Sequence, residues 1–404
     1  MDSKRVLILS PNIGLHMGLG GGCRVAAIMA ELLAKAGFEV ILTALRGLPT
    51  EVLDEVHGTQ LSKFKAKGLV KEAYIFGYGR SPRIPFPLAV RLITFYLRKL
   101  IKEYNPALLI FHDDIPRSLE NILRRSCTRV ILYSHFPYAA RVLLNLYDPW
   151  EKYLNDQKGL LQRIYRTLLK RVLNIPRDLD VKLISNSTVT KKFMKYLWKK
   201  RSEVIYPPVV CSTATNNPPN LHTKKDIVLV LAPLQPNKRV GEVIEAFSKC
   251  QRGKLIIAGW AAHSKYVKYL QKKVKELDLS ERVRIYTNVS EQFKWSLLAK
   301  AKIIISAAFF EPFGVSIVEG MSSGVVPIVR KGTLSGPWID IVCHGTYGLG
   351  FSDLEELSSL IDELLSNSEL FRGYSAKAYA RSRYFGIEKF SSVFLMKIEE
   401  IMRA

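Results

Sequence analysis

The sequence predicts an α/β protein of two domains, each built on a parallel sheet with helices on its faces. One reason is length, because 404 residues exceed what a single core of ordinary size holds. Another is pattern, because short apolar runs alternate with segments of helical periodicity in both halves, as in successive β–α–β units. The third is a stretch rich in Pro, Asn and Thr between the halves, which is typical of a domain connection. We therefore expect domains at 1–206 and 226–383, a linker at 207–225 and a C-terminal helix at 384–404.

Bulk composition excludes several classes of protein. A hydrophobic content of 48% is too high for a disordered chain. The five cysteines are scattered, without a CxxC pair, so we expect neither a disulfide framework nor a zinc site, and a reducing, cytoplasmic setting is favoured. The first residues enter a strand without a secretory leader, and no apolar run reaches the roughly 18 residues of a membrane span. We expect a soluble protein, or one that is peripheral on the cytoplasmic face of a membrane.

Positive charge is concentrated in the first half. The formal net charge is +24, and residues 1–206 hold 34 Lys and Arg against 17 Asp and Glu. Such an excess favours a polyanionic partner, which can be nucleic acid, an acidic membrane surface or a phosphorylated acceptor. A generally basic, solvated surface is the alternative interpretation, and the sequence leaves the two evenly balanced.

The chain opens with a β–α–β unit. The strand RVLILS (5–10) leads through a glycine-rich loop to a helix over 24–36 and then to the strand FEVILTA (38–44). The loop is not a GxGxxG fingerprint and no acid follows the second strand, so a dinucleotide site is not expected. Backbone amides at the helix start can still meet a phosphate, although a tight turn needing small residues explains the same glycines: Gly20, Gly21 and Gly22.

Two histidines stand where strands of the first domain end. His112 closes ALLIFH and His135 follows RVILYS, and open parallel sheets bind ligands at the carboxyl ends of their strands. His135 is the first candidate for a role in the site and His112 the second. The helix expected over 86–104 is apolar with cations spaced along it, and we favour core packing over a place in a membrane interface.

Two basic stretches carry apolar residues between their cations. At 141–177 the apolar residues recur with helical spacing, and KKFMKYLWKKR (191–201) places six cations around aromatic and apolar residues that include Leu197 and Trp198. Docking on an anionic bilayer is the favoured interpretation. Nucleic acid is the rival, and no recognisable nucleic-acid module supports it. The DxD-like triplet at 178–180 precedes a strand and is interpreted as a surface turn, so we expect no catalytic metal.

The second domain opens with DIVLVLAP (226–233), after which PNKR enters a helix. Lys238 and Arg239 stand at that turn, where their charge opposes the helix dipole, so a purely structural explanation is poor. A departing diphosphate gains negative charge and is stabilised by such cations. We therefore take both residues as candidates for binding a diphosphate.

The segment EPFGVSIVE (311–319) lies between the apolar runs KIIIS and VVPIV. Its spacing puts Glu311 in a loop at a strand exit and Glu319 about a turn and a half inside the next helix. Backbone N–H groups near Gly314 and Val315 form a helix N-terminus suited to an anion. Two acids beside an anion cradle suit a nucleotide sugar, although an N-cap acid and a solvent-facing helical Glu would explain a lone pair of acids.

This block resembles the Glu-x7-Glu signature of retaining glycosyltransferases of family 4, which adopt the GT-B fold. The resemblance runs over most of the chain, and its other pieces are GLGGGCRVA, YSHFPY, LISNST, VIYPPV, PNK, LIIAG and SGPWIDIV. SHFPY and SGPWIDIV are most similar to the α-1,2-mannosyltransferases of the dolichol pathway, which use GDP-mannose. The resemblance implies two Rossmann-like domains facing a central cleft. The first would bind the acceptor, the second would bind the nucleotide sugar, and the last helix would cross back to the first.

The resemblance also implies roles for single residues. Glu311 and His135 would meet the transferred sugar, and Glu319 would bind the ribose hydroxyls. The donor diphosphate would be bound by Lys238, Arg239 and the amides at Gly314 and Val315, and the loop of Gly20, Gly21 and Gly22 would close on the donor phosphates or the acceptor. Family members usually carry an Arg five residues before the Lys, where this chain has Pro233, so Arg239 is the expected substitute. Asp340 is a further candidate beside the sugar.

The expected function is therefore retaining, metal-independent transfer of a hexose. The first candidate is mannose, carried from GDP-mannose to a glycan or polyprenyl-linked acceptor at a membrane surface, with no cofactor beyond the substrates. A second hypothesis is a non-catalytic basic protein of the same fold that associates with membrane or nucleic acid. A third is a phosphorylase of similar fold, which the lack of a clear pyridoxal-phosphate lysine signature disfavours.

Overall fold

The chain forms two compact units. The computed structural model describes residues 4–11, 17–18, 20–78, 84, 86–126, 128–137, 167, 179–210 and 219–403. The first unit extends to Pro208 and takes up the chain again at Phe390, and the second extends from Val209 to Lys389. The last helix, α17 (Ile387–Arg403), therefore begins in one unit and continues in the other.

The first unit contains a sheet of seven strands in the order β3-β2-β1-β4-β5-β6-β7, and each neighbouring pair is parallel. Its central strands are continuous apolar runs because helices cover both faces. The strands are β1 (Arg5–Leu9), β2 (Glu39–Ala44), β3 (Val70–Tyr74), β4 (Leu108–His112), β5 (Arg129–Ser134), β6 (Lys182–Ser185) and β7 (Glu203–Val204).

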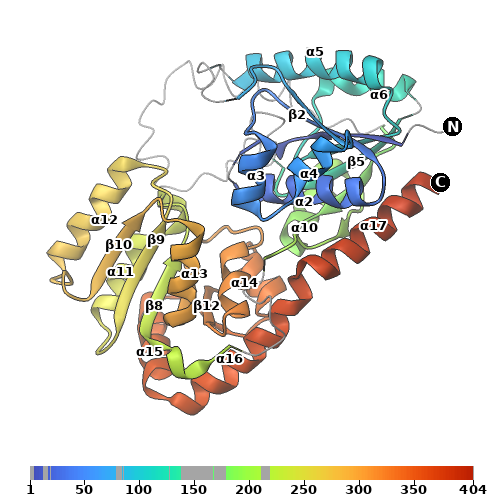
Figure 1. Cartoon of the computed structure of the whole chain (residues 1–404). Helices are drawn as coiled ribbons and strands as arrows, with labels where there is room; N and C mark the ends of the chain where they lie inside the picture. Colours follow the sequence, from blue (N-terminus) through green and yellow to red (C-terminus); the bar gives the residue numbers. More distant parts are fainter. Residues whose placement is uncertain are drawn as a thin grey trace. The chain divides into compact units, whose positions relative to one another are not determined.

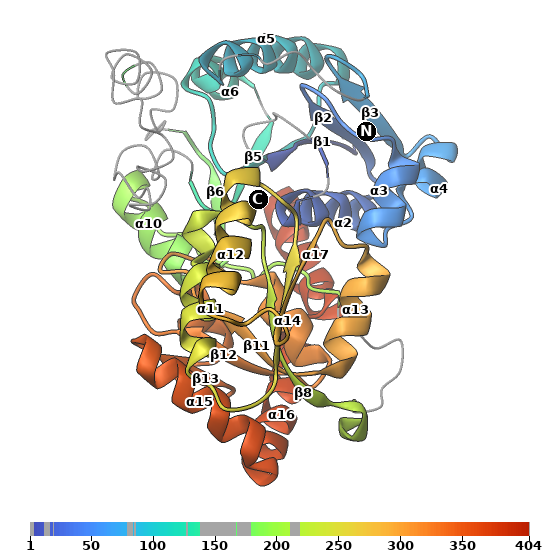
Figure 2. The same ribbon diagram turned by 90° about the vertical axis from the view of Figure 1, so that its left-hand side faces the viewer.

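Helices lie on both faces of this sheet, with α5 and α6 on one and α2 on the other (Figures 1 and 2). The C-terminal part of α17 joins this unit, where Lys397 Nζ lies 2.8 Å from the Glu203 carboxylate at the sheet edge. The helices are α2 (Gly21–Lys35), α3 (Thr50–His57), α4 (Leu61–Ala66), α5 (Phe86–Tyr104), α6 (Glu120–Arg125) and α10 (Thr188–Trp198), with a short 3₁₀ turn, η1 (Arg117–Leu119).

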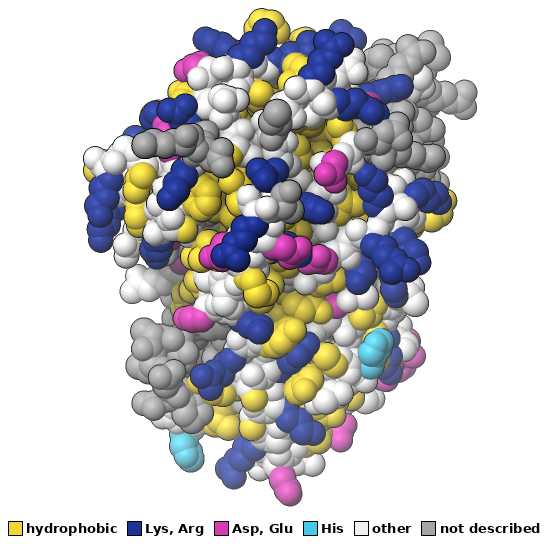
Figure 3. All heavy atoms as spheres, turned by 90° about the vertical axis from the view of Figure 1, so that its right-hand side faces the viewer, with side chains coloured by type: hydrophobic (Ala, Val, Ile, Leu, Met, Phe, Trp, Pro, Cys, Tyr) yellow, Lys and Arg dark blue, Asp and Glu magenta, His cyan; other side chains and the backbone are white. Residues whose placement is uncertain are grey.

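The helix α5 has one face in the core and one in solvent. The predicted core packing is confirmed, because the residues of the inward face are buried: Ala89, Val90, Ile93, Leu97, Leu100 and Ile101. The outward face exposes Leu88 and Phe95 among cations, and Phe95 is 75% exposed. In the face drawn in Figure 3, dark blue Lys and Arg side chains gather at the top, with hydrophobic atoms exposed among them.

The prediction that residues 191–201 form a basic docking surface is wrong for two of their apolar side chains. Leu197 and Trp198 are only 8% and 2% exposed and belong to the core, because they fall on the inward face of α10, whose start is fixed by the Ser187 hydroxyl accepting from the N–H of Thr190. Tyr196 stays 60% exposed among the lysines. The other basic stretch, 141–177, lies outside the described residues except for Thr167, as does Asp178 of the triplet expected to form a turn.

The second unit contains a sheet of six strands in the order β10-β9-β8-β11-β12-β13, again parallel throughout. The predicted α/β class, with a parallel sheet in each half, is confirmed. The strands are β8 (Lys225–Leu231), β9 (Lys254–Gly259), β10 (Val283–Thr287), β11 (Ala301–Ser306), β12 (Val326–Arg330) and β13 (Leu349–Phe351).

Helices connect successive strands of this sheet and bury their apolar faces on it. Residues from α11, α12 and α15 form one core with the strands, while α14 packs on α16. The helices are α11 (Val240–Ser248), α12 (Ser264–Glu276), α13 (Glu291–Lys300), α14 (Val315–Ser322), α15 (Leu354–Ser366) and α16 (Ser368–Ser382), with the short turns η2 (Leu221–Thr223), η3 (Pro236–Lys238), η4 (Pro337–Ile341) and η5 (Arg383–Phe385). No helix among the described residues is both long enough and apolar enough to cross a membrane.

Candidate functional site

The predicted site residues of the second unit lie where its parallel strands end. The chain leaves β8 through η3 and enters α11 after Arg239, and it leaves β11 through a loop that enters α14 after Gly314. Since β8 and β11 are neighbours in the sheet, both exits are at the same edge. This is the edge at which open α/β sheets bind ligands.

Lys238 and Glu311 meet at this edge. The Lys238 ammonium forms an ion pair with the Glu311 carboxylate across 73 positions of sequence. Only 19% of the Lys238 side chain and 17% of the Glu311 side chain are exposed. Partial removal from water makes the attraction stronger than in a surface pair, and it also makes either charge costly to leave alone.

The backbone of Glu311 is held by the loop that follows β12. Its N–H donates to Leu334 O at 3.2 Å, and its carbonyl accepts from Gly336 N–H at 2.7 Å. The two loops approach each other so closely that a Cβ on Gly336 would stand 1.9 Å from Pro312 O. Glycine is therefore required at 336 for this loop to fix the position of Glu311.

Gly314 shapes the N-terminus of α14. Its φ of 102° is left-handed, and a Cβ there would lie 2.8 Å from Pro337 Cγ, so glycine is required on both counts. No side chain of residue 314 can cap the helix. The N–H of Ile317 donates to Gly314 O at 3.0 Å, whereas the N–H groups before it, from Val315, precede the first acceptor that a helix provides. This geometry is that of the anion cradle expected from the sequence.

Glu319 lies inside α14 and is 4% exposed. Its Oε1 is 2.9 Å from Lys294 Nζ, and Lys294 also pairs with Glu291 one turn earlier in α13. The spacing of the two acids predicted the helical placement of Glu319 but gave no sign of Lys294. A cation from the neighbouring helix compensates this buried carboxylate.

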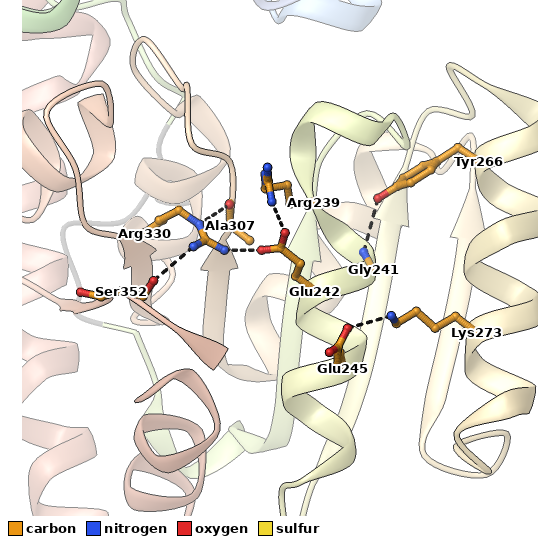
Figure 4. A network of polar contacts seen from close by, with 9 residues as sticks. All are labelled: Arg239, Gly241, Glu242, Glu245, Tyr266, Lys273, Ala307, Arg330 and Ser352. Atoms are coloured by element: carbon orange, nitrogen blue, oxygen red, sulfur yellow. Dashed lines mark hydrogen bonds and ion pairs between the residues drawn. The ribbon is translucent and has the colours of Figure 1, made fainter. Parts of the chain in front are cut away.

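Arg239 does not share the partner of Lys238. It sits at the N-cap of α11 with a left-handed φ of 53°, and its guanidinium pairs with Glu242 in the first turn (Figure 4). Glu242 also pairs with Arg330 at the end of β12. Both guanidinium carbons lie over the ring of Phe309, at 3.9 Å for Arg239 and 4.4 Å for Arg330 from its centroid.

In the first unit, His112 and His135 form a hydrogen-bonded pair. Nδ1 of His112 is 3.0 Å from Nε2 of His135, with the ring planes 10° apart. Asp113 Oδ1 accepts from the backbone N–H groups of His135 and Phe136 at 3.0 and 3.2 Å, which anchors the exit of β5. The two candidates from the sequence thus act on each other.

The glycine-rich loop meets this pair at one point. A Cβ on Gly22 would come within 3.2 Å of His135 Nε2 and 3.1 Å of Pro11, so the start of α2 packs closely against the imidazole. At Gly20 and Gly21 a Cβ would meet nothing within 4 Å. Of these three glycines, only Gly22 stands where a Cβ would be crowded by neighbouring side chains.

Burial makes both histidines poor bases. Removal from water lowers the pKa of His112 well below its usual range, and repulsion from His135 lowers it further. Desolvation also lowers the pKa of His135, against the opposing attraction of Asp113. The pair is therefore neutral near pH 7. Because each ring uses one nitrogen in the bond between them, each has one other nitrogen, and one of these two is a donor and the other an acceptor.

Other candidates have mainly structural surroundings. Asp340 is 3% exposed in η4, and its carbonyl accepts from Arg381 at 2.8 Å. Pro233 follows β8, at the position where family members usually carry an Arg, and its side chain has no charge. Within the described part of the chain, no three His, Cys, Asp or Glu side chains converge in a way that could hold a metal ion.

Sequence reasoning missed Glu242, Arg330 and Lys294. A usable signal existed for Arg330, because a charged residue closing the apolar run VVPIVR is unusual for a strand buried on both faces. Glu242 and Lys294 resemble ordinary polar residues in the first turns of helices, and their sequence neighbours do not reveal their partners.

Two family models match successive parts of the chain. "Glycosyltransferase Family 4" matches residues 19–213, and "Glycosyl transferases group 1" matches residues 213–381.

Among curated proteins, the chain is similar to several named "GDP-Man:Man(3)GlcNAc(2)-PP-Dol alpha-1,2-mannosyltransferase". The one from Dictyostelium discoideum is 25% identical over 61% of this chain and 53% of its own length. The one from Candida albicans is 25% identical over 80% of this chain and 59% of its length. The chain spans about half the length of the curated relatives it matches.

Solved structures share the whole fold at low identity. A glycosyltransferase from Rickettsia africae superposes with a TM-score of 0.68 at 18% identity, over 100% of this chain and 99% of that one. The sucrose-phosphate synthase of Thermosynechococcus elongatus gives 0.71 at 14% identity, over 99% of each chain. These likenesses show the fold, and the predicted GT-B class is confirmed.

The loop around Glu311 should tolerate no side chain at 336. We expect Gly336→Ala to lower the free energy of unfolding by about 1–3 kcal/mol, because its Cβ overlaps the Pro312 carbonyl. Gly373→Ala is the matched control, since it lies in α16 with open space around it and should be stabilising by about 0.5–1 kcal/mol. Urea denaturation measures both free energies. Equal effects of the two substitutions would contradict the close contact between Gly336 and the Pro312 carbonyl.

The histidine pair should make stability depend on pH. Because both folded-state pKa values are lowered, the unfolded chain binds more protons once the pH falls below about 6.5. The stability is thus fully present above that pH and decreases as the pH falls toward the folded-state values. Between pH 7.5 and 5.5, His112→Gln should show a smaller loss of unfolding free energy than the parent protein. Replacing the exposed His222 by Gln is the control and should leave the loss unchanged.

Proposed function

Because the chain belongs to the glycosyltransferases of family 4 and group 1, we propose that it transfers a hexose from a nucleotide diphosphate donor with retention of configuration. The donor we propose is GDP-mannose and the acceptor a lipid-linked glycan, in keeping with the names of the curated relatives. The reaction as proposed needs no metal and no cofactor other than its substrates.

The observation that carries this proposal is the meeting of Lys238 and Glu311 at the carboxyl edge of the second sheet. A cation and an acid from two different strand exits stand beside the open N-terminus of α14. Leaving-group charge and developing positive charge at a sugar require groups of opposite sign close together. A structural ion pair alone would not require the helix N-terminus beside it.

Donor binding would exchange partners at this edge. In the proposed complex, Lys238 and Arg239 turn to the diphosphate, supported by the amides of Gly314 and Val315. Glu311, released from Lys238, meets the sugar as its anomeric carbon gains positive charge. Glu319 binds the ribose hydroxyls, with Lys294 holding the carboxylate in place.

The proposed chemistry needs no enzymic nucleophile. The acceptor hydroxyl attacks on the face from which the diphosphate departs and passes its proton to the departing diphosphate oxygen, so the α configuration is retained. Retaining glycosidases instead pair two carboxylates about 5 Å apart, one of which forms a covalent intermediate. For His135 we propose a hydrogen bond to the transferred sugar, and the glycine loop of residues 20–22 would close on the donor phosphates or the acceptor.

We further propose that the first unit docks on an anionic membrane through the outward face of α5. This face combines exposed Leu88 and Phe95 with cations at positions 91, 98, 99 and 102. Apolar side chains that enter the interface while cations meet anionic lipid heads are typical of peripheral helices. An anionic leaflet is typically the cytoplasmic one.

Glu319→Ala tests the donor site. We expect the Kd for GDP-mannose to rise at least tenfold, since a hydrogen bond to a charged group contributes about 1.5–3 kcal/mol and tenfold corresponds to about 1.4 kcal/mol. Thermal shifts with GDP, UDP and ADP sugars identify the base, and calorimetry then measures the affinity. Glu363→Gln, on the remote helix α15, serves as control. An unchanged affinity would remove Glu319 from the site, and a lack of binding or transfer with every donor would refute the transferase proposal.

Phe95→Ser tests the docking face. Burying a phenylalanine side chain contributes about 1.5–3 kcal/mol, so partial insertion predicts about tenfold weaker binding to vesicles of phosphatidylcholine and phosphatidylserine. Met396→Ser, on α17 and 66% exposed in the parent, is the matched control and should bind as the parent does. Co-sedimentation with these vesicles and with pure phosphatidylcholine provides the measurement. Equal effects of both substitutions would exclude α5 as the docking element.

A further inference from the structure

Glu242 is shared by two arginines that come from different parts of the second sheet's edge. Arg239 lies three residues before it at the start of α11, and Arg330 reaches it across 88 positions from the end of β12 (Figure 4). One carboxylate therefore faces two guanidinium groups. The cluster carries a net positive charge beside Lys238.

The two arginines are held very differently. Arg330 is 4% exposed, and its other donors are fixed: Nε donates to Ala307 O at 2.8 Å and Nη1 to Ser352 O at 3.4 Å. Burial lowers its pKa, against the opposing attraction of Glu242, but an arginine remains charged at any physiological pH. Arg330 is thus a cation held in place by hydrogen bonds to the loops after β11 and β13.

Arg239 stands at the start of a helix, whereas Arg330 closes a strand of the sheet. It has the left-handed backbone of an N-cap at φ 53°, a conformation that is costly for a residue with a side chain and that tends to occur at functional sites. Its pair with Glu242 is local, at three positions' spacing, and its guanidinium lies over the half-exposed ring of Phe309. It can exchange one anionic partner for another without disturbing a strand.

We propose that Arg330 retains Glu242 when Arg239 leaves it for a diphosphate, so that no carboxylate is left unpaired at the moment of binding. In the ligand-free protein Glu242 holds both arginines, and in the bound state it holds Arg330 alone while Arg239 contacts the phosphates. Arg330 is then a positioning residue that acts through Glu242. The diphosphate is that of the donor proposed above, and on this point the inference rests on the proposed function.

The physical reason is the cost of an isolated charge. Glu242 has only 27% of its side chain exposed, and breaking one partner from a buried or half-buried pair is strongly unfavourable because the remaining charge is uncompensated. Without Arg330, every diphosphate that bound Arg239 would have to overcome that cost. With Arg330 in place, the exchange of partners is close to balanced.

A double-mutant cycle separates this role from a merely structural one. Arg330→Met removes the charge while an unbranched side chain fills the space, and we expect the Kd for GDP and for inorganic pyrophosphate to rise about tenfold, which corresponds to about 1.4 kcal/mol. Glu242→Gln removes the competitor for Arg239, so these ligands should bind at least as tightly as to the parent. In the Glu242→Gln background, Arg330→Met should change the Kd less than about threefold, because no carboxylate remains to be stranded. The measurement is calorimetric titration of the full-length chain at a temperature where thermal unfolding shows each variant folded.

Glu245→Gln is the matched control. Glu245 lies one turn further along α11 and pairs with Lys273 at 2.8 Å (Figure 4), so this variant removes an acid from the same helix without touching the cluster, and its Kd values should equal those of the parent. If Arg330→Met weakens binding equally in both backgrounds, Arg330 acts only on the fold or the general potential and the inference is overturned. Should Arg330→Met fail to fold, Glu242→Gln alone decides, because weaker binding in that variant contradicts the model.

The outcomes also separate this inference from the transferase proposal. If the effects of Arg330→Met and Glu242→Gln on the Kd for GDP and pyrophosphate are coupled but no donor supports sugar transfer, the exchange of partners is supported and the transferase proposal is refuted. Sugar transfer by the parent together with additive effects in the cycle would refute the exchange alone.

Discussion

A carboxylate withdrawn from water needs a cation beside it, and this requirement organises the carboxyl edge of the second sheet. Each of three acids at this edge is paired with a cation, and only one of these cations is a near neighbour in sequence. The pairs are Glu311 with Lys238, Glu319 with Lys294, and Glu242 with both Arg239 and Arg330. The same contacts that fix the loops also set the charge that a ligand meets. In the proposed complex an anion binds here by replacing a carboxylate as the partner of a cation.

The sequence could predict the fold because strands that are buried on both faces consist of continuous apolar residues. It could also place Glu311 in a loop and Glu319 in a helix, since that follows from spacing alone. What it could not give were contacts between distant positions, such as the 88-residue separation of Glu242 and Arg330. Nor could spacing decide which face of the helix at 191–201 is inward, and Trp198 was assigned to the surface although it belongs to the core.

The edge of the first sheet is built on a different principle. Its candidates are two neutral histidines bonded to each other, and the nearby Asp113 carboxylate accepts from backbone N–H groups and so stabilises the exit of β5. The sequence predicted that His112 and His135 each stand at the end of a strand. The structure shows that the two strands are neighbours, because β4 and β5 pair in parallel with His112 opposite Tyr133.

The two edges differ in the chemical groups that they can bind. Ion pairs respond strongly to a ligand's charge, whereas neutral imidazoles act through directed donors and acceptors and respond little to it. Burial keeps the histidines neutral, so the pair adds no positive charge to the edge of the first sheet. A hydroxyl-rich sugar or acceptor is a natural partner for such groups, and a phosphate is not. In the proposed reaction the cations of the second unit would therefore meet the charged diphosphate, while the neutral imidazoles of the first unit would meet hydroxyl groups of the sugar.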